Sequence, residues 1–209
     1  MNIGIFKRGK HMNRLHYQIH EETMYIVPVN NGGYIESRVG ETYGGGIDCR
    51  LNPNKLIERN CRNHSQNYAA RKDLTKTLTG ITSKLPVIVD LFGAYIYFCT
   101  HSDRIAENNW FNIRHVQSYW NDGGMTRVQF SNNEERIIDI SYASFNNQYL
   151  NALKLHYKFN QQKEKYQKKE MNMHFQYPTL GRGEVAQINE TIYHSYINYI
   201  NGLQIKDEV

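Results

Sequence analysis

The sequence has few cysteines and no long apolar run, and both shortages narrow the classes of protein to which it can belong. Its three cysteines, Cys49, Cys61 and Cys99, lie far apart and are odd in number, so they do not form the disulfide framework of a small secreted protein. We interpret them as reduced thiols of a cytoplasmic protein. The most apolar segment, residues 85–99, is shorter than the roughly 20 residues that a helix needs to cross a bilayer, and it carries Asp90. This segment is expected to be core.

Motifs for export, for lipid attachment and for holding a nucleotide or metal are also missing. Lys7 and Arg8 interrupt the only candidate for a signal peptide, and neither terminus matches a lipidation pattern. The triplet at residues 44–46 lacks the G-x-x-x-x-G-K pattern of a phosphate loop. Cys61 and His64 form a single C-x-x-H pair, and one pair cannot close a tetrahedral metal site. We therefore expect no membrane, no metal and no cofactor.

The composition is that of a folded protein with a basic surface. The chain has 209 residues, enough for one domain or a domain with an appendage. Hydrophobic residues make up 40% and aromatic residues 12%. A formal net charge of +5 and a pI near 9.0 favour a polyanionic partner over a basic protein. Such a charge has meaning only where it is clustered.

The charge does cluster, in residues 58–72 with the sequence ERNCRNHSQNYAARK. Arginines and amides hold phosphates and contact base edges, because both donate several hydrogen bonds from a flat group. Two interpretations stay open, a nucleic-acid interface or a solvated basic helix end. The residues that we expect a nucleic-acid interface to use are Arg59, Arg62, Asn63, Asn67, Arg71 and Lys72.

Short alternating patterns predict an antiparallel sheet covered on one side. An Asn-Gly pair between two apolar runs indicates a hairpin, with its turn at residues 30–32. The predicted strands are residues 24–29, 33–39, 47–51, 87–90, 94–99, 110–120, 126–131 and 136–140. The carboxylate of Asp90 is expected to close the turn at residues 91–93.

A helix is predicted to begin at Pro53 and to reach about Asn63, which places the first part of the basic stretch on a helix. Tyr68, Arg71 and Lys72 are then expected on a loop, where side chains adapt readily to a ligand.

A long helix follows the predicted strands. Ser141 or Ser144 can cap it, and its apolar face over residues 145–159 should pack on the sheet. Residues 185–203 repeat apolar side chains every three or four positions, which predicts a C-terminal amphipathic helix that lies on its own domain or joins a second subunit. The predicted fold class is therefore α+β: an antiparallel-sheet-rich core with a long helix packed on it and a C-terminal amphipathic helix.

Several motifs in order carry a resemblance to a known family. The basic stretch contributes Arg59, Cys61, Tyr68, Arg71 and Lys72, and departs from the family pattern at Asn60, Ser65, Gln66, Asn67 and Ala70. Further matches are KLPVIVD at 84–90, WFNIRHV at 110–116, Phe130-Ser131-Asn132 and ISYASFNNQ at 140–148. With these motifs, residues 56–159 resemble the competence transcription factor (ComK) family of Gram-positive bacteria, DNA-binding activators of the genes for DNA uptake.

The resemblance implies a function and its partners. It implies a nucleoid-associated activator that binds paired A/T-rich boxes of double-stranded DNA through the minor groove. It also implies a homo-oligomer built from dimers, and an adaptor of a regulatory protease as a further partner. Arg59, Arg71 and Lys72 lie on family motif positions, whereas Arg62, Asn63 and Asn67 are chosen for their local chemistry.

With this resemblance the chain is expected to have four parts. They are an N-terminal extension at 1–23, a DNA-binding core domain at 24–160, a basic helix end and connector at 161–183, and a C-terminal helix at 184–209. Replacing Arg71 by alanine is expected to remove the A/T preference, at a cost of about 1 to 3 kcal/mol if the side chain enters the groove.

Two alternative functions stay open. The tyrosine-rich stripe near the carboxyl terminus can bind a protein partner, with the basic face incidental. A metal-dependent nuclease would draw acid and base groups from His64, His101, His115, Asp90 and Asp103. No two carboxylates or histidines share a recognisable catalytic spacing, so we do not expect an enzyme.

Overall fold

This computed structural model describes residues 17–90 and 92–172, with side chains described to residue 167. The chain divides into two compact units, residues 1–165 and 166–209, and the architecture below is that of the first. None of the described helices is long and apolar enough to span a membrane. The predicted C-terminal helix at 184–209 and most of the predicted connector at 161–183 lie outside the described residues. Tyr17 and Ile19, expected in the extension at 1–23, are buried in the core.

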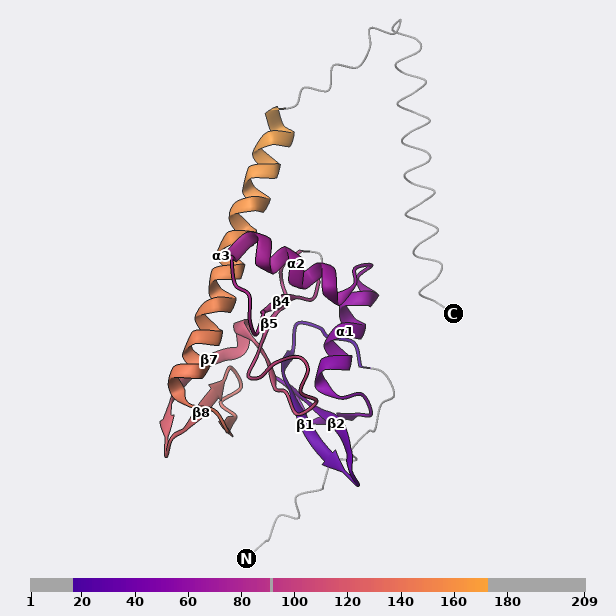
Figure 1. Ribbon diagram of the computed structural model, residues 1–209, viewed down its shortest axis with the longest axis vertical. Helices are drawn as coiled ribbons and strands as arrows, with labels where there is room; N and C mark the ends of the chain where they lie inside the picture. Colours follow the sequence, from indigo (N-terminus) through magenta and orange to yellow (C-terminus); the bar gives the residue numbers. More distant parts are fainter. Residues whose placement is uncertain (1–16, 91, 173–209) are drawn as a thin grey trace, which may run out of the picture. The chain divides into compact units, whose positions relative to one another are not determined.

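The described residues of the first unit form two antiparallel sheets and three α-helices (Figure 1), which confirms the predicted α+β class. The large sheet has the strand order β3-β2-β1-β6-β5-β4 and the small sheet the order β7-β8-β9. In chain order the elements are β1 (Thr23–Asn31), β2 (Tyr34–Glu41), β3 (Ile47–Cys49), α1 (Pro53–Asn63), α2 (Tyr68–Thr79), β4 (Val87–Ile88), β5 (Ile96–Cys99), β6 (Trp110–Asn112), the 3₁₀ turn η1 (Ile113–His115), β7 (Val116–Asp122), β8 (Met125–Phe130), β9 (Glu135–Ile138) and α3 (Tyr142–Asn172).

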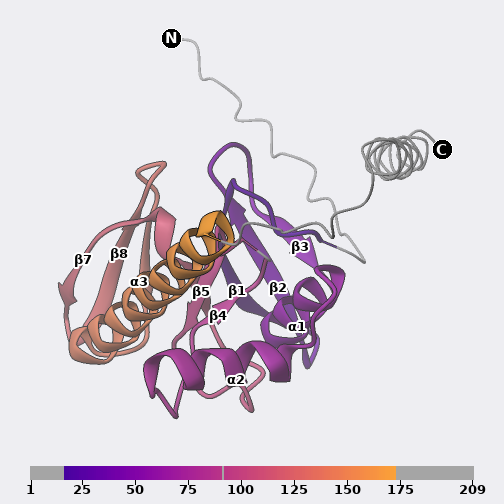
Figure 2. The same cartoon turned by 90° about the horizontal axis from the view of Figure 1, so that it is seen from above.

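The predicted single covered face holds for β8 of the small sheet, where Thr126, Val128 and Phe130 are buried, but it is wrong for the large sheet, whose central strands are buried on both faces. Alternate residues of β5 point to opposite sides: Phe98 belongs to the apolar cluster shared with the small sheet and α3, and Tyr97 to the cluster shared with α1. Figure 2 shows α3 running between the two sheets on the one side and α1 beside the large sheet on the other. All four residues of β5 are buried, which is typical of a strand covered on both faces.

Local signals in the sequence explain several elements. The predicted hairpin is confirmed, with Gly32 and Gly33 in the left-handed region and the Gly33 N–H donating to Asn30 Oδ1 at 3.1 Å. The expected role of Asp90 is also confirmed, because its carboxylate accepts hydrogen bonds from the backbone N–H groups of Phe92, Ala94 and Tyr95 at 2.8–3.1 Å.

The predicted single strand at 110–120 is wrong. The structure divides it into β6 of the large sheet and β7 of the small one, joined by η1. The side chain of Asn112 is the cause: its oxygen accepts from the Arg114 N–H at 3.1 Å, and its buried Nδ2 donates to the Thr23 carbonyl at 3.1 Å. A side chain that binds the backbone two residues ahead turns the chain away from the first sheet.

The expected loop after residue 63 is wrong as well, because Tyr68 begins the helix α2. Asn67 caps this helix by accepting a hydrogen bond from the Ala70 N–H at 2.7 Å, and Gly80 ends it at φ 73°. The helix α1 has the predicted bounds, Pro53–Asn63. At the start of α3 the hydroxyl of Ser141 accepts from the Ser144 N–H at 3.3 Å, as expected.

Candidate nucleic-acid interface

The carboxyl end of α1 presents three of the predicted site residues. Arg62 has a side chain that is 70% exposed and is paired with Glu58, one turn earlier, at 3.0 Å. Asn63 is exposed, whereas Arg59 is partly buried and its charge acts on the thiol of Cys49. The helix dipole favours a cation in the last turn of a helix, which stabilises Arg62 at this position. Its exposed side chain can still turn toward the solvent.

The structure places Asn67 and Arg71 differently from the sequence expectation. Asn67 is exposed, but its side-chain oxygen is used in capping α2. Arg71 is only 2% exposed, and its Nε and Nη2 find no hydrogen-bond partner among the described residues. Burial lowers the pKa of the Arg71 guanidinium from its ordinary value. The Arg71 side chain therefore lies on the buried face of α2 and is not accessible at the surface.

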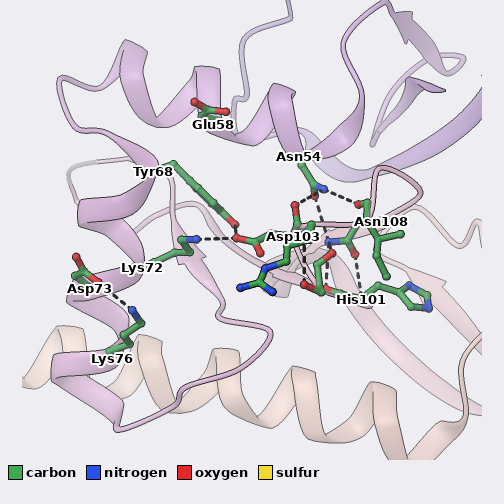
Figure 3. Close-up of polar contacts among 12 residues, drawn as sticks. Asn54, Glu58, Tyr68, Lys72, Asp73, Lys76, His101, Asp103 and Asn108 are labelled. Carbon is green, nitrogen blue, oxygen red and sulfur yellow. Dashed lines mark hydrogen bonds and ion pairs between the residues drawn. The ribbon is translucent and has the colours of Figure 1, made fainter. Parts of the chain in front are cut away.

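Lys72, on the next position of α2, is fixed by an acidic side chain (Figure 3). Its Nζ lies 2.8 Å from Asp103 Oδ2, and the Tyr68 hydroxyl donates to the same oxygen at 3.1 Å. The ammonium group also lies 4.8 Å from the centre of the Tyr68 ring. Although partial burial opposes ionisation of Asp103, the hydrogen bond and charge of Lys72 hold its pKa below the ordinary value. The carboxylate therefore stays ionised and keeps Lys72 in place.

The loop that carries Asp103 is tied to α1 through amides. Asn54 Nδ2 donates to the carbonyls of Asp103 and Ile105 at 3.0 and 2.6 Å, while its oxygen accepts from Trp110 Nε1 at 2.8 Å. Asn108 is fully buried and binds the loop backbone at His101 (Figure 3). This network was not predicted, because residues 54 and 103–108 come together only in the folded chain.

A cleft of about 470 Å³ lies beside the Lys72–Asp103 pair, between α2, the loop at 82–85 and the loop at 102–104. Its walls carry four cations, Lys72, Lys76, Lys84 and Arg104, with one carboxylate, Asp103. The hydroxyls of Thr82, Ser83 and Ser102 also line it. Sequence analysis predicted Lys72 only. Lys84 begins the KLPVIVD motif but is not among the predicted site residues, and Lys76 and Arg104 belong to none of the quoted motifs.

Two of the groups on which a nuclease would draw are engaged in other contacts of the described structure. Asp90 is occupied by three backbone N–H groups. His115 binds Ser131 Oγ at 2.8 Å and the Glu21 carbonyl at 2.7 Å. Over residues 17–90 and 92–172, no group of three or more His, Cys, Asp or Glu side chains is placed to hold a metal. Burial raises the pKa of Cys61 to about 12, so this thiol is packed and protonated.

Comparison with known proteins agrees with the motifs. The family model described as ComK protein matches residues 14–164. The competence transcription factor of Bacillus subtilis (strain 168) is 30% identical over 148 residues, which cover 68% of this chain and 74% of that protein. No solved structure matches.

Proposed function

The chain belongs to the ComK protein family, and on that premise we propose that it is a DNA-binding activator of competence genes. In this proposal it acts in the cytoplasm on the nucleoid, and binds paired A/T-rich boxes through the minor groove as an oligomer. The protein of Bacillus subtilis to which it is similar is named a competence transcription factor.

The observation that carries the DNA-binding part is the position of Arg62. Its side chain is 70% exposed at the carboxyl end of α1, next to Asn63. The basic cleft is lined by the following helix, α2. A/T-rich tracts narrow the minor groove and deepen its negative potential, which draws in arginine while offering few base-specific contacts. An exposed arginine whose partner is a surface glutamate exchanges that partner for DNA at little cost.

The predicted site residues take two roles in this proposal. Arg62 and Asn63 enter the groove, with Arg59 and Lys72 beside them. Arg71 and Asn67 hold α2 in place, because the first is buried and the second caps the helix. The presence of an arginine at this family motif position is then explained by the packing of its side chain under the DNA-contacting surface.

The oligomer is supported by α3. Leu150, Leu153 and Tyr157 follow each other at helical spacing and are 51%, 37% and 60% exposed. Apolar side chains aligned on one exposed helix face suit a second copy of the chain. An adaptor of a regulatory protease remains a further proposed partner, which rests on the family alone.

The proposal is tested by a gel-shift salt titration on a duplex with two A/T-rich boxes, beside a G/C-substituted duplex of equal length. We expect preference for the A/T duplex, affinity that falls steeply with salt, and no effect of a chelator. Equal, weak binding to both duplexes would contradict sequence-specific recognition. Cleavage that a chelator abolishes would favour the nuclease instead.

A further inference from the structure

We propose that the cleft between α2 and the loop at 102–104 binds a phosphate group, and that its source is the backbone of the bound DNA. The inference rests on the proposed function and adds a second contact to it. The end of α1 would meet the minor groove, and the cleft would hold the strand that borders the groove. Contacts to phosphates position a protein on a duplex without distinguishing sequences.

The charges of the cleft are the first support. Four cations surround one carboxylate, so the cleft keeps an excess of positive charge. Lys72 is paired with Asp103, and Lys76 lies 3.1 Å from Asp73, which is itself largely exposed. Lys84 and Arg104 form no salt bridge with any residue in the described part of the chain. These two cations are therefore the ones available to an incoming anion.

Hydrogen bonds keep Lys72 and the backbone of the loop at 102–104 in position before a ligand arrives. Asp103 and Tyr68 fix Lys72, and Asn54 ties the loop of Asp103 and Arg104 to α1. On the opposite wall Lys84 has a positive φ of 45°, an uncommon conformation for a residue other than glycine. Because Lys72 and the loop backbone are already ordered, the site loses less freedom when it binds.

The donors around the cleft suit a phosphate. Lysine ammonium groups and an arginine guanidinium form charge-assisted hydrogen bonds with phosphate oxygens, and the hydroxyls of Ser83 and Ser102 add neutral donors. A volume of about 470 Å³ is larger than one phosphate needs and falls within the range of small-molecule sites. A nucleotide is therefore a second source of the same chemistry, which the experiment must separate from DNA.

The experiment uses the full chain with the double variant Lys84→Gln/Arg104→Gln. Its matched control is Arg50→Gln/Arg114→Gln, which removes two exposed cations that do not line the cleft. The measurement is the slope of log K against log salt concentration on the A/T duplex. We expect the cleft variant to lower the slope by about 1 to 2, to weaken affinity about tenfold, and to leave the A/T-to-G/C ratio unchanged. The control should keep the wild-type slope.

A parallel arm tests free phosphate groups. Inorganic phosphate and ATP are titrated into the wild type and the cleft variant without DNA, and the shift in Tm is recorded. A Tm shift in the wild type only, with an unchanged salt slope in the variant, would keep the phosphate site but overturn DNA as its source and assign the site to a small phosphoanion. Unchanged slope and unchanged Tm response in the cleft variant would overturn the site while the proposed function stands.

The two proposals fail separately. If the wild type binds neither duplex, the proposed function fails, and the Tm arm alone decides the cleft. In that case a phosphate or ATP response that the cleft variant loses supports the site, and its absence overturns it. Unfolding by urea, measured on both double variants, confirms that each protein compared is folded.

Discussion

Asn60 Oδ1 accepts a hydrogen bond from the backbone N–H of Ile19 at 2.8 Å. The amide nitrogen of Asn60 completes the link by donating to the Tyr17 carbonyl at 3.1 Å and to the Leu56 carbonyl at 2.9 Å. Asn60, Tyr17 and Ile19 are all buried, and the last two belong to the cluster that α1 shares with the large sheet. One side chain of α1 therefore fastens the segment before β1 to the core.

Replacing Asn60 by alanine should lower the free energy of unfolding by roughly 2 to 3 kcal/mol, because it leaves a buried N–H and a buried carbonyl without partners. Urea unfolding followed by circular dichroism measures the change. Asn63→Ala is the matched control, since this amide lies three residues later in α1 and is exposed. A cost at Asn60 no larger than that at Asn63 would show that the segment is not held in this way.

The elements that sequence analysis predicted well are those with local signals. Pro53 and the capping residue Asn52 mark the start of α1, and the Asn-Gly turn marks the first hairpin. Asn60 shows the limit of such signals. It stands among exposed amides in the basic stretch, and nothing in the sequence separates it from them, yet its place on the inner face of α1 makes it structural.

The helix α2 was not predicted because its most buried residues are polar, and Leu74 and Leu78, which pack on the core beside them, are only partly buried. Its buried residues are Arg71, Thr75 and Thr79, so the apolar repeat that marks an amphipathic helix is short. The buried threonine hydroxyls have backbone hydrogen-bond partners: Thr75 Oγ1 donates to the Pro86 carbonyl at 2.8 Å. The cleft was beyond prediction for another reason. Lys84 and Arg104 come to lie beside α2 only when the chain folds, and a single sequence carries no signal for such a tertiary contact.

Gly93→Ala should destabilise the protein more than Gly80→Ala. Both glycines have φ above +70°, so alanine strains the backbone at either by about 1 to 2 kcal/mol. A Cβ on Gly93 would in addition lie 2.6 Å from the ring of Phe159 on α3, whereas one on Gly80 meets nothing within 4 Å. The difference should be about 1 to 3 kcal/mol in urea unfolding. Equal costs at the two positions would mean that α3 does not pack against the Asp90 turn.

The pairing of Lys72 with Asp103 should make part of the stability sensitive to acid. The pKa of Asp103 is held below its ordinary value of 3.8 in the folded protein, so its contribution is present above that pH and is lost as the pH falls through the folded pKa. Its side chain is 28% exposed, and we expect the contribution to be about 1 kcal/mol or less.

The variant Asp103→Asn isolates this effect. The difference in unfolding free energy between the wild type and the variant should be constant from pH 6 to pH 8 and should shrink below about pH 4. Urea unfolding at a series of pH values measures it. A difference that grows as the solution becomes more acidic would contradict the assigned direction of the pKa.

Replacing Arg71 by methionine should leave the protein folded and should not remove DNA binding. Methionine fills much of the space of the arginine, and the change removes a buried cation whose Nε and Nη2 have no hydrogen-bond partner among the described residues. The nearby Asp90 carboxylate keeps its three backbone N–H donors. The free energy of unfolding should therefore change by less than about 1 kcal/mol or increase. Alanine is a poorer probe, because it would also leave a cavity.

The matched variant is Arg62→Met, which removes the same charge from the exposed end of α1. In the gel shift on the A/T duplex, Arg62→Met should lose about 1 to 3 kcal/mol of binding free energy together with part of the A/T preference. Arg71→Met should stay close to the wild type. If Arg71→Met is folded and loses the preference instead, α2 must move on binding DNA to release the buried guanidinium. The orphaned N–H groups of Arg71 would then favour that movement, since a phosphate or a base edge would satisfy them.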